Sequence, residues 1–256
     1  AIIMYRTHTC GQLRLENVNE KVCLSGWVQK IRNLGAMSFI DLRDRYGITQ
    51  LVVEESATAE IKDKAARLGR EFVIQVNGKV VERASKNAKI PTGDIEIWID
   101  TLDILSHSEI PPFTIEDNSD GGDELRMKYR YLDLRRSIVR KNLELRHQMA
   151  HLVRNYLDNE HFMEVETPVL QAIPGGASAR PFITHHNALD IPLYLRIANE
   201  LYLKRLIVGG FDGVYEFSRN FRNEGMDRTH NPEFTCMEII CLLQGLQLDD
   251  GFHRKN

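Results

Sequence analysis

Residues 212–239 read DGVYEFSRNFRNEGMDRTHNPEFTCMEI, and this stretch decides the fold of the second half of the chain. Apolar and polar residues alternate on both sides of a polar segment, which predicts two antiparallel strands joined by a loop. Arg222, Glu224, His230 and Phe234 lie along this hairpin. Taken alone, the pattern also fits a charged surface hairpin with an Arg–Glu pair.

The spacing of these four residues resembles the second signature motif of class II aminoacyl-tRNA synthetases, the hairpin that binds ATP. The resemblance implies that Arg222 bridges the amino-acid carboxylate and the α-phosphate of ATP, which makes it the catalytic candidate. Both reacting groups are negative, so a fixed guanidinium offsets the charge that builds in the transition state. The resemblance further implies that Glu224 accepts a hydrogen bond from the adenine amino group, that Phe234 stacks on adenine, and that His230 reaches the outer phosphates.

The segment before the hairpin, PGGASARPFITHHNALDIPLYLRIANELYLKRLIVGGF (residues 174–211), resembles lysyl-tRNA synthetase, and this resemblance runs from about 166 to 239. It implies that Gly176 and Glu200 hold the substrate α-amino group and that Glu238 is a further active-site carboxylate. A carbonyl and a carboxylate are suitable partners for an ammonium group. Adjacent strand residues point to opposite faces, so His185 and His186 are poor joint ligands, and no metal site is predicted there.

Residues 137–159 carry apolar side chains at helical spacing, with Ser137 as the expected N-cap. FMEVETPVL (162–170) follows as an expected strand that stops at Pro168. A helix, a strand and a proline in this order resemble the first class II signature motif, which implies a homodimer. The whole region 137–256 is therefore expected to form an incomplete class II synthetase domain built on antiparallel sheet.

The alternation of apolar and polar residues in the first half of the chain predicts a small barrel. Five alternating segments are expected as strands, and 57–69, which ends at glycine, is expected as a helix between the third and the fourth. The strands are expected at 22–29, 37–44, 47–54, 71–82 and 94–105. This is the order of an OB-fold, whose open face binds single-stranded nucleic acid. The expected fold class is α+β with an N-terminal all-β OB-fold barrel.

Arg32, Phe39 and Gln50 lie on or beside the first three expected strands and offer a cation, an aromatic plane and an amide for base recognition. Each alone also fits a core or solvated position. Three runs resemble bacterial aspartyl-tRNA synthetase within residues 4–170: MYRTHTCGQLRLENV, SGWVQKIRNLGAMSFIDLRDRYGITQLVV and RMKYRYLDLRR. The resemblance implies that Arg32, Phe39 and Gln50 contact anticodon bases. Asn33 departs from it, because the family usually has an aspartate there.

The domain limits expected are 1–108 for the barrel, 109–136 for a linker, and 137–256 for the catalytic part with motifs 1 and 2. The two resemblances change near 162–170, so a chimeric sequence is expected. Residues 241–256 resemble nothing known to us. Reading 246–256 one base later, with chosen codons, gives YNWMMDFTEK, which fits the lysyl family, so a frameshift is expected. The third motif and the family's Mg²⁺ ligands are then absent, and negligible activity is expected.

Composition sets the remaining bounds. The net charge of -3 neither favours nor excludes nucleic acid, and no apolar run approaches the roughly 20 residues that span a bilayer. Four cysteines without CxxC spacing favour a reduced, cytoplasmic chain. The sequence thus predicts an ATP-dependent aminoacyl-tRNA ligase that binds tRNA and an amino acid, with an aspartate-type anticodon domain and a lysine-type pocket. The alternatives are a non-catalytic tRNA-binding OB-fold protein and a general single-strand binder.

Overall fold

The computed structural model describes residues 5–242. The chain divides into two compact units, residues 1–143 and 144–256, which are described one at a time. Helix α4 (Ser137–Asn159) begins in the first unit and continues into the second. The tail predicted to be frameshifted, 241–256, lies outside the described residues except for Cys241 and Leu242.

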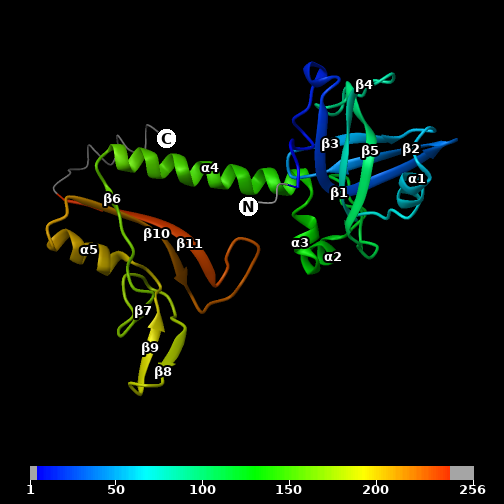
Figure 1. The fold of residues 1–256 in the computed structure, drawn as a ribbon. Helices are drawn as coiled ribbons and strands as arrows, with labels where there is room; N and C mark the ends of the chain where they lie inside the picture. Colours follow the sequence, from blue (N-terminus) through cyan, green and yellow to red (C-terminus); the bar gives the residue numbers. More distant parts are fainter. Residues whose placement is uncertain (1–4, 243–256) are drawn as a thin grey trace. The chain divides into compact units, whose positions relative to one another are not determined.

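The first unit contains a closed barrel with strand order β1-β2-β3-β5-β4 (Figure 1). Its strands are antiparallel neighbours except β3 and β5, which run parallel. The short helix α1 connects β3 and β4. The bounds are η1 (Leu15–Asn17), β1 (Lys21–Leu34), β2 (Met37–Arg43), β3 (Ile48–Val53), α1 (Ala59–Ala66), β4 (Val73–Glu82) and β5 (Ile95–Ser106). The predicted OB-fold barrel is confirmed.

Alternation along the strands explains the barrel core. Ile95, Ile97 and Ile99 of β5 point inward and are buried, while the residues between them face outward. Gly78 of β4 lies where the register shifts, and a Cβ there would come within 2.3 Å of the Trp98 carbonyl oxygen. Helix α1 is shorter than the predicted 57–69. It begins at Ala59 because the Thr58 side chain caps it, accepting a hydrogen bond from the Ile61 backbone N–H, and it ends at Ala66 with Arg67 as the C-cap.

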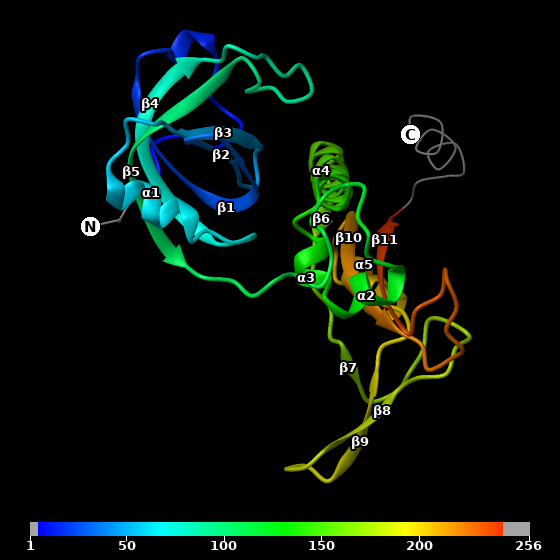
Figure 2. The same cartoon turned by 90° about the vertical axis from the view of Figure 1, so that its right-hand side faces the viewer.

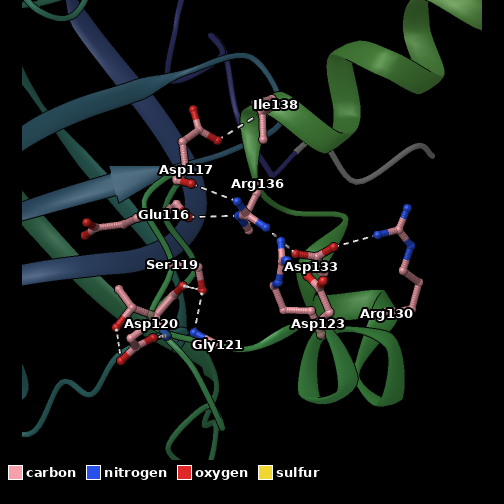
Figure 3. A network of polar contacts seen from close by, with 12 residues as sticks. Glu116, Asp117, Ser119, Asp120, Gly121, Asp123, Arg130, Asp133, Arg136 and Ile138 are labelled. Atoms are coloured by element: carbon pink, nitrogen blue, oxygen red, sulfur yellow. Dashed lines mark hydrogen bonds and ion pairs between the residues drawn. The ribbon is translucent and has the colours of Figure 1, made fainter.

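The predicted linker, 109–136, has local structure of its own. It contains α2 (Asp123–Lys128) and α3 (Arg130–Asp133). In Figure 3 the buried guanidinium of Arg136 lies between this segment's polar groups. It donates to the Asp133 carboxylate (2.7 Å) and to the backbone carbonyls of Glu116 (2.9 Å) and Asp117 (2.7 Å). These bonds give a segment rich in proline, glycine and acid a defined path.

The start of α4 differs from the prediction. Ser137 was expected as the N-cap, but it is the first helical residue, and the cap comes from Asp117, twenty residues earlier. The Asp117 carboxylate accepts a hydrogen bond from the Ile138 backbone N–H (3.0 Å; Figure 3) and another from the Ser137 hydroxyl. Partial burial raises the pKa of Asp117, but these hydrogen bonds and the Arg136 charge outweigh it and hold the pKa below its ordinary value.

A buried charge cluster joins the barrel to the residues just before α4. Glu71, with a φ of 62°, accepts two hydrogen bonds from Arg43 (2.8 and 2.7 Å) and one from Arg135 (2.6 Å). Both guanidinium groups also lie over the Trp27 ring, at 5.9 and 4.5 Å from its centroid. A carboxylate this deeply buried requires such pairing.

The second unit contains two three-stranded sheets, ordered β11-β10-β6 and β7-β9-β8 (Figure 2). The long hairpin of β10 and β11 pairs from Gly213↔Cys241 to Phe221↔Glu233, which confirms the antiparallel-sheet prediction. The bounds are β6 (Met163–Glu164), β7 (Leu170–Gln171), β8 (Ile183–His186), β9 (Ile191–Leu195), α5 (Glu200–Val208), β10 (Gly213–Phe221) and β11 (Glu233–Cys241). The single strand predicted at 162–170 is instead two short strands, because β6 pairs with β10 and β7 with β9.

Helix α4 packs against one face of the hairpin. The Arg154 guanidinium lies 4.2 Å from the Phe217 ring centroid, and the Tyr215 hydroxyl donates to Asp158 (2.9 Å). Because side chains alternate along a strand, the opposite face is left for other contacts. Among the described helices, none combines the length and apolarity needed to cross a membrane.

Candidate functional site

The hairpin face opposite α4 carries the candidate site. Phe234, Cys236 and Glu238 alternate along β11 and face the same way. Their register partners on β10 are Asn220, Ser218 and Glu216, all nearly inaccessible to solvent. An apolar ring therefore stands at one end of this face and carboxylates at the other.

Arg222 and Phe234 are in contact at the loop end of the hairpin. The Arg222 backbone N–H donates to the Pro232 carbonyl (2.8 Å), which closes the loop between the strands. Its guanidinium carbon lies 5.1 Å from the Phe234 ring centroid. Arg222 Nε is buried and has no hydrogen-bond partner within residues 5–242, so this guanidinium keeps donor capacity for an anion.

Glu224 and His230 lie on the loop. Backbone hydrogen bonds connect the loop to Arg180: the Asn223 N–H donates to the Arg180 carbonyl (2.8 Å), and the Arg180 N–H donates to Glu224 Oε1 (3.3 Å). The exposed His230 ring is paired instead with Asp227, at 2.9 Å. Hydrogen bonds from the Thr229 N–H and from His230 hold the pKa of Asp227 below its ordinary value. The structure thus brings Arg222 and Phe234 together, and Glu224 follows Arg222 by two residues in the chain. His230 is not part of this group, because its ring pairs with Asp227.

The three predicted amino-acid contacts gather where α5 begins. Gly176 has a φ of +88°, and a Cβ there would lie 3.1 Å from the Ala198 Cβ and 3.4 Å from the Glu200 Cβ. Glu200 is the first residue of α5 and pairs with Lys204. Burial raises the pKa of Glu238, and the negative charge of Glu200 and of Glu216 adds to this rise. Glu200 and Glu238 therefore share one electrostatic environment next to Gly176.

Sequence reasoning missed the buried network beneath these residues. Glu216 accepts hydrogen bonds from Arg196 (2.8 Å), Thr167 (2.7 Å) and Asn199 (2.9 Å). Burial alone would raise the pKa of Glu216, but these donors and the Arg196 charge hold it below its ordinary value. The sequence did hold a sign of this network. Glu216 lies inside the alternating run VYEFS (214–218), where it shares one face of the strand with Val214 and Ser218.

Arg32, Phe39 and Gln50 come together in the first unit, around an open cavity of about 510 Å³. Arg32 faces Phe39 in the register of β1 and β2, and its guanidinium donates to Asp41 (2.8 Å) and to Gln50 Oε1 (3.1 Å). Gln50 Nε2 in turn donates to Glu96 (2.9 Å). The cavity therefore offers cationic, amide and aromatic groups on one surface.

The sequence reasoning missed further lining residues of this cavity. Arg83 donates to Gln50 Oε1 (3.0 Å), and the Trp98 indole donates to Glu96 (3.1 Å). Trp98 is 37% exposed and Leu34 is 66% exposed, which is unusual for such large apolar side chains. The period of two along β5 was the missed signal, because it puts Trp98 on the outer face with Glu96. Asn33 is exposed at the edge of β1 and accepts a hydrogen bond from Ser38 (2.9 Å).

The His, Cys, Asp and Glu side chains do not gather into a metal site in the described part of the chain. Over residues 5–242 there is no cluster of three or more His, Cys, Asp or Glu side chains that could hold a metal ion. His185 pairs with Asp190 (3.0 Å), while His186 Nδ1 accepts from the Leu189 N–H (3.2 Å), so the two rings have different partners.

Two family models match the chain, one over the barrel and one from residue 122 onward. Residues 22–105 match the OB-fold nucleic acid binding domain, and residues 122–244 match the tRNA synthetases of class II (D, K and N). With a barrel, an antiparallel hairpin and this site, the chain belongs to the class II tRNA synthetases. Within that class it is homologous to bacterial aspartyl-tRNA synthetases.

The relatives support this placement. Aspartate–tRNA ligase of Bacteroides thetaiotaomicron is 53% identical over 249 residues, and that of Porphyromonas gingivalis is 52% identical over 250. Each match covers 96% of this chain and 42% of the relative, so the chain spans about two-fifths of their length. The crystal structure of asparaginyl-tRNA synthetase from Pyrococcus horikoshii, complexed with asparaginyl-adenylate, superposes with a TM-score of 0.84 at 27% identity. That superposition covers 98% of this chain and 56% of the other.

The lysine-type pocket and the chimeric origin find no support in these comparisons. The matches to aspartate–tRNA ligases cover 96% of the chain, so they extend on both sides of the seam expected at 162–170. The class II model groups D, K and N enzymes together, and its match over residues 122–244 includes the same segment. The expected inactivity likewise finds no support.

Proposed function

We propose that this chain is part of an aspartate–tRNA ligase that forms aspartyl-adenylate and binds tRNA, and that it works in the cytoplasm. The contact between Arg222 and Phe234 carries this proposal, because it sets a cation with donor capacity beside an aromatic plane at the loop end of the hairpin. Relatives that are 53% identical are aspartate–tRNA ligases, and a structural relative holds an aminoacyl-adenylate.

The proposed chemistry follows from the hairpin. ATP is a substrate whose adenine stacks on Phe234, while the Glu224 carboxylate accepts from its amino group. The carboxylate oxygen of the amino acid bonds to the α-phosphorus, the bond from that phosphorus to the bridging oxygen breaks, and pyrophosphate leaves. Arg222 donates to the α-phosphate and to the attacking carboxylate, and offsets the negative charge that grows between them. His230 would have to leave its pair with Asp227 to reach the outer phosphates.

The amino-acid end is proposed to lie near Gly176, Glu200 and Glu238. The α-ammonium group is a cation with three donors, so a backbone carbonyl and two carboxylates suit it. Class II synthetases use Mg²⁺, which supplies charge neutralisation at the phosphates. The described residues do not provide a metal cluster, so no step is assigned to metal in this part of the chain.

The first unit is proposed to hold the anticodon. Arg32, Phe39 and Gln50 surround one cavity, and Trp98 adds a second exposed ring to it. Stacking on such rings is worth about 1–3 kcal/mol per base. The proposal also includes the domain limits 1–108, 109–136 and 137–256. It further includes a homodimer formed through α4, which exposes Leu145, Met149 and Leu152.

A titration with three non-hydrolysable sulfamoyl-adenosine analogues tests the proposal. The aspartyl, asparaginyl and lysyl analogues are each titrated into the full chain by calorimetry. We expect the aspartyl analogue to bind at least about tenfold more tightly than the others, a difference of about 1.4 kcal/mol. Equal binding of all three would refute aspartate specificity, and preference for the lysyl analogue would reverse it.

The alternative is a tRNA-binding protein without adenylate chemistry, which the cavity of the first unit favours by itself. Binding of the anticodon stem-loop of aspartate tRNA, with no detectable binding of any adenylate analogue, would establish this alternative. Equal binding of unrelated single-stranded RNA would indicate a general single-strand binder.

A further inference from the structure

Asn199 lies beside both carboxylates of the hairpin face. It is the residue before α5, is 0% exposed, and donates through side-chain Nδ2 to Glu216 Oε2 (2.9 Å). Its backbone N–H lies close enough to the Glu238 carboxylate to lower the pKa of that group. Glu216 and Glu238 are directly opposite in the register of β10 and β11, so Asn199 lies beside two facing carboxylates.

The orientation of the Asn199 amide follows from chemistry. A carboxylate accepts hydrogen bonds and cannot donate, so the NH₂ group must face Glu216 and the oxygen must point elsewhere. Asn199 Oδ1 is then a buried acceptor without a partner in residues 5–242, and Glu238 Oε2 is another. Buried acceptors without donors cost stability, so this arrangement is not one that stability alone would favour.

We propose that Asn199 is a positioning residue for the amino-acid end of the adenylate site. Its side chain anchors the start of α5 to Glu216, and this anchor aims its backbone N–H at Glu238, leaving one Glu238 oxygen open to the substrate. Glu200, the next residue, is placed by the same anchor. The inference rests on the proposed function and adds a residue that does not itself touch the nucleotide.

Several charged groups surround Asn199, so a charge on the side chain at position 199 would change how it interacts with Glu216. Arg196, which precedes α5, pairs with Glu216, and Glu238 faces Glu216 from β11. Glu200 and Lys204 form a pair on α5. A neutral amide adds a donor without adding charge. A carboxylate at position 199 would face Glu216 across the same distance and raise the pKa of the pair by like-charge repulsion.

Asn199→Ala in the full chain tests the anchor. By calorimetry, we expect the aspartyl sulfamoyl-adenosine analogue to bind roughly ten- to a hundredfold more weakly, which is the effect of losing one hydrogen bond to a charged group. Binding of ATP alone should change by less than about twofold, because the nucleotide contacts lie at the other end of the hairpin. Asn187→Ala, an exposed asparagine in the same unit, is the matched control and should leave both affinities unchanged.

Asn199→Asp gives a second readout that a purely structural role would not move. At pH 8 we expect the analogue to bind Asn199→Asp weakly. At pH 5.5 the ratio of wild-type to variant affinity should fall severalfold, since a protonated carboxyl can again donate to Glu216. A ratio that does not change with pH contradicts the proposal, including the case in which Asn199→Ala fails to fold.

The failures can be told apart. If the wild-type chain binds no analogue, the proposed function fails. If the wild type binds and Asn199→Ala binds equally well, only the role of Asn199 is refuted. If Asn199→Ala weakens ATP and the analogue alike, the residue supports the fold of the whole site and the positioning role is wrong.

Discussion

Two buried carboxylates in this protein, Glu71 and Glu216, are paired with side chains that lie far away in the sequence. Glu71 is held by Arg43 and Arg135, and Glu216 by Arg196. Their sequence separations explain why single-residue patterns did not reveal them. Removing one member of such a group leaves the other charge buried without a partner, which costs more than the pair contributes.

Glu71→Ala is therefore expected to destabilise the first unit. The buried guanidinium of Arg43 and the partly buried one of Arg135 lose their carboxylate, and the free energy of unfolding should fall by about 3–5 kcal/mol. Urea denaturation followed by tryptophan fluorescence measures this, with Glu55→Ala, an exposed glutamate, as control. A loss as small as the control's would mean that Glu71 does not hold the cluster together.

At the scale of elements, the strands of the barrel and the hairpin were predictable because their alternation is local. The predicted strand 162–170 was wrong because a strand is defined by its partners, and here β6 and β7 join different sheets. The cap of α4 was missed for the same reason, since Asp117 is remote in sequence. The contact of Arg32 with Gln50 was foreseeable only through family resemblance, and Arg83 was not foreseen at all.

Removal of the cap should weaken α4. Asp117→Ala is expected to lower the free energy of unfolding by about 0.5–2 kcal/mol at pH 7, and Asn118→Ala, an exposed neighbour, to leave it unchanged. The folded pKa of Asp117 lies below its ordinary value of 3.8, so its contribution is complete above that pH. It is lost as the pH falls through the lower, folded pKa.

The gap between wild type and Asp117→Ala should accordingly close under acid conditions. Chemical denaturation at a series of pH values between 7 and about 2.5 measures this gap. A gap that stays constant to the lowest pH would show that the carboxylate charge plays no part in the cap.

At the scale of the whole molecule, each compact unit carries one candidate site. The barrel cavity lies within residues 1–143, and the hairpin face lies within residues 144–256. Two activities on separate units can be lost separately. The OB-fold model lies wholly within the first unit, while the class II model begins at residue 122 of that unit and extends through the second.

Two variants should separate the activities. Phe39→Ala is expected to weaken binding of the aspartate anticodon stem-loop by about 1–3 kcal/mol through lost stacking, with adenylate-analogue binding unchanged. Arg222→Ala should weaken binding of the adenylate analogue and leave binding of the anticodon stem-loop unchanged. Filter binding for RNA and calorimetry for the analogue measure both, and a variant that lost both activities would contradict the assignment of one site to each unit.

A crystal structure of the full chain with the aspartyl sulfamoyl-adenosine analogue tests the central claim most directly. We predict adenine stacked on the Phe234 ring, the sulfamate within hydrogen-bond distance of the Arg222 guanidinium, and the ammonium group beside Glu200 and Glu238. An analogue bound away from the β10–β11 hairpin, with Arg222 still directed only at Phe234, would contradict the account.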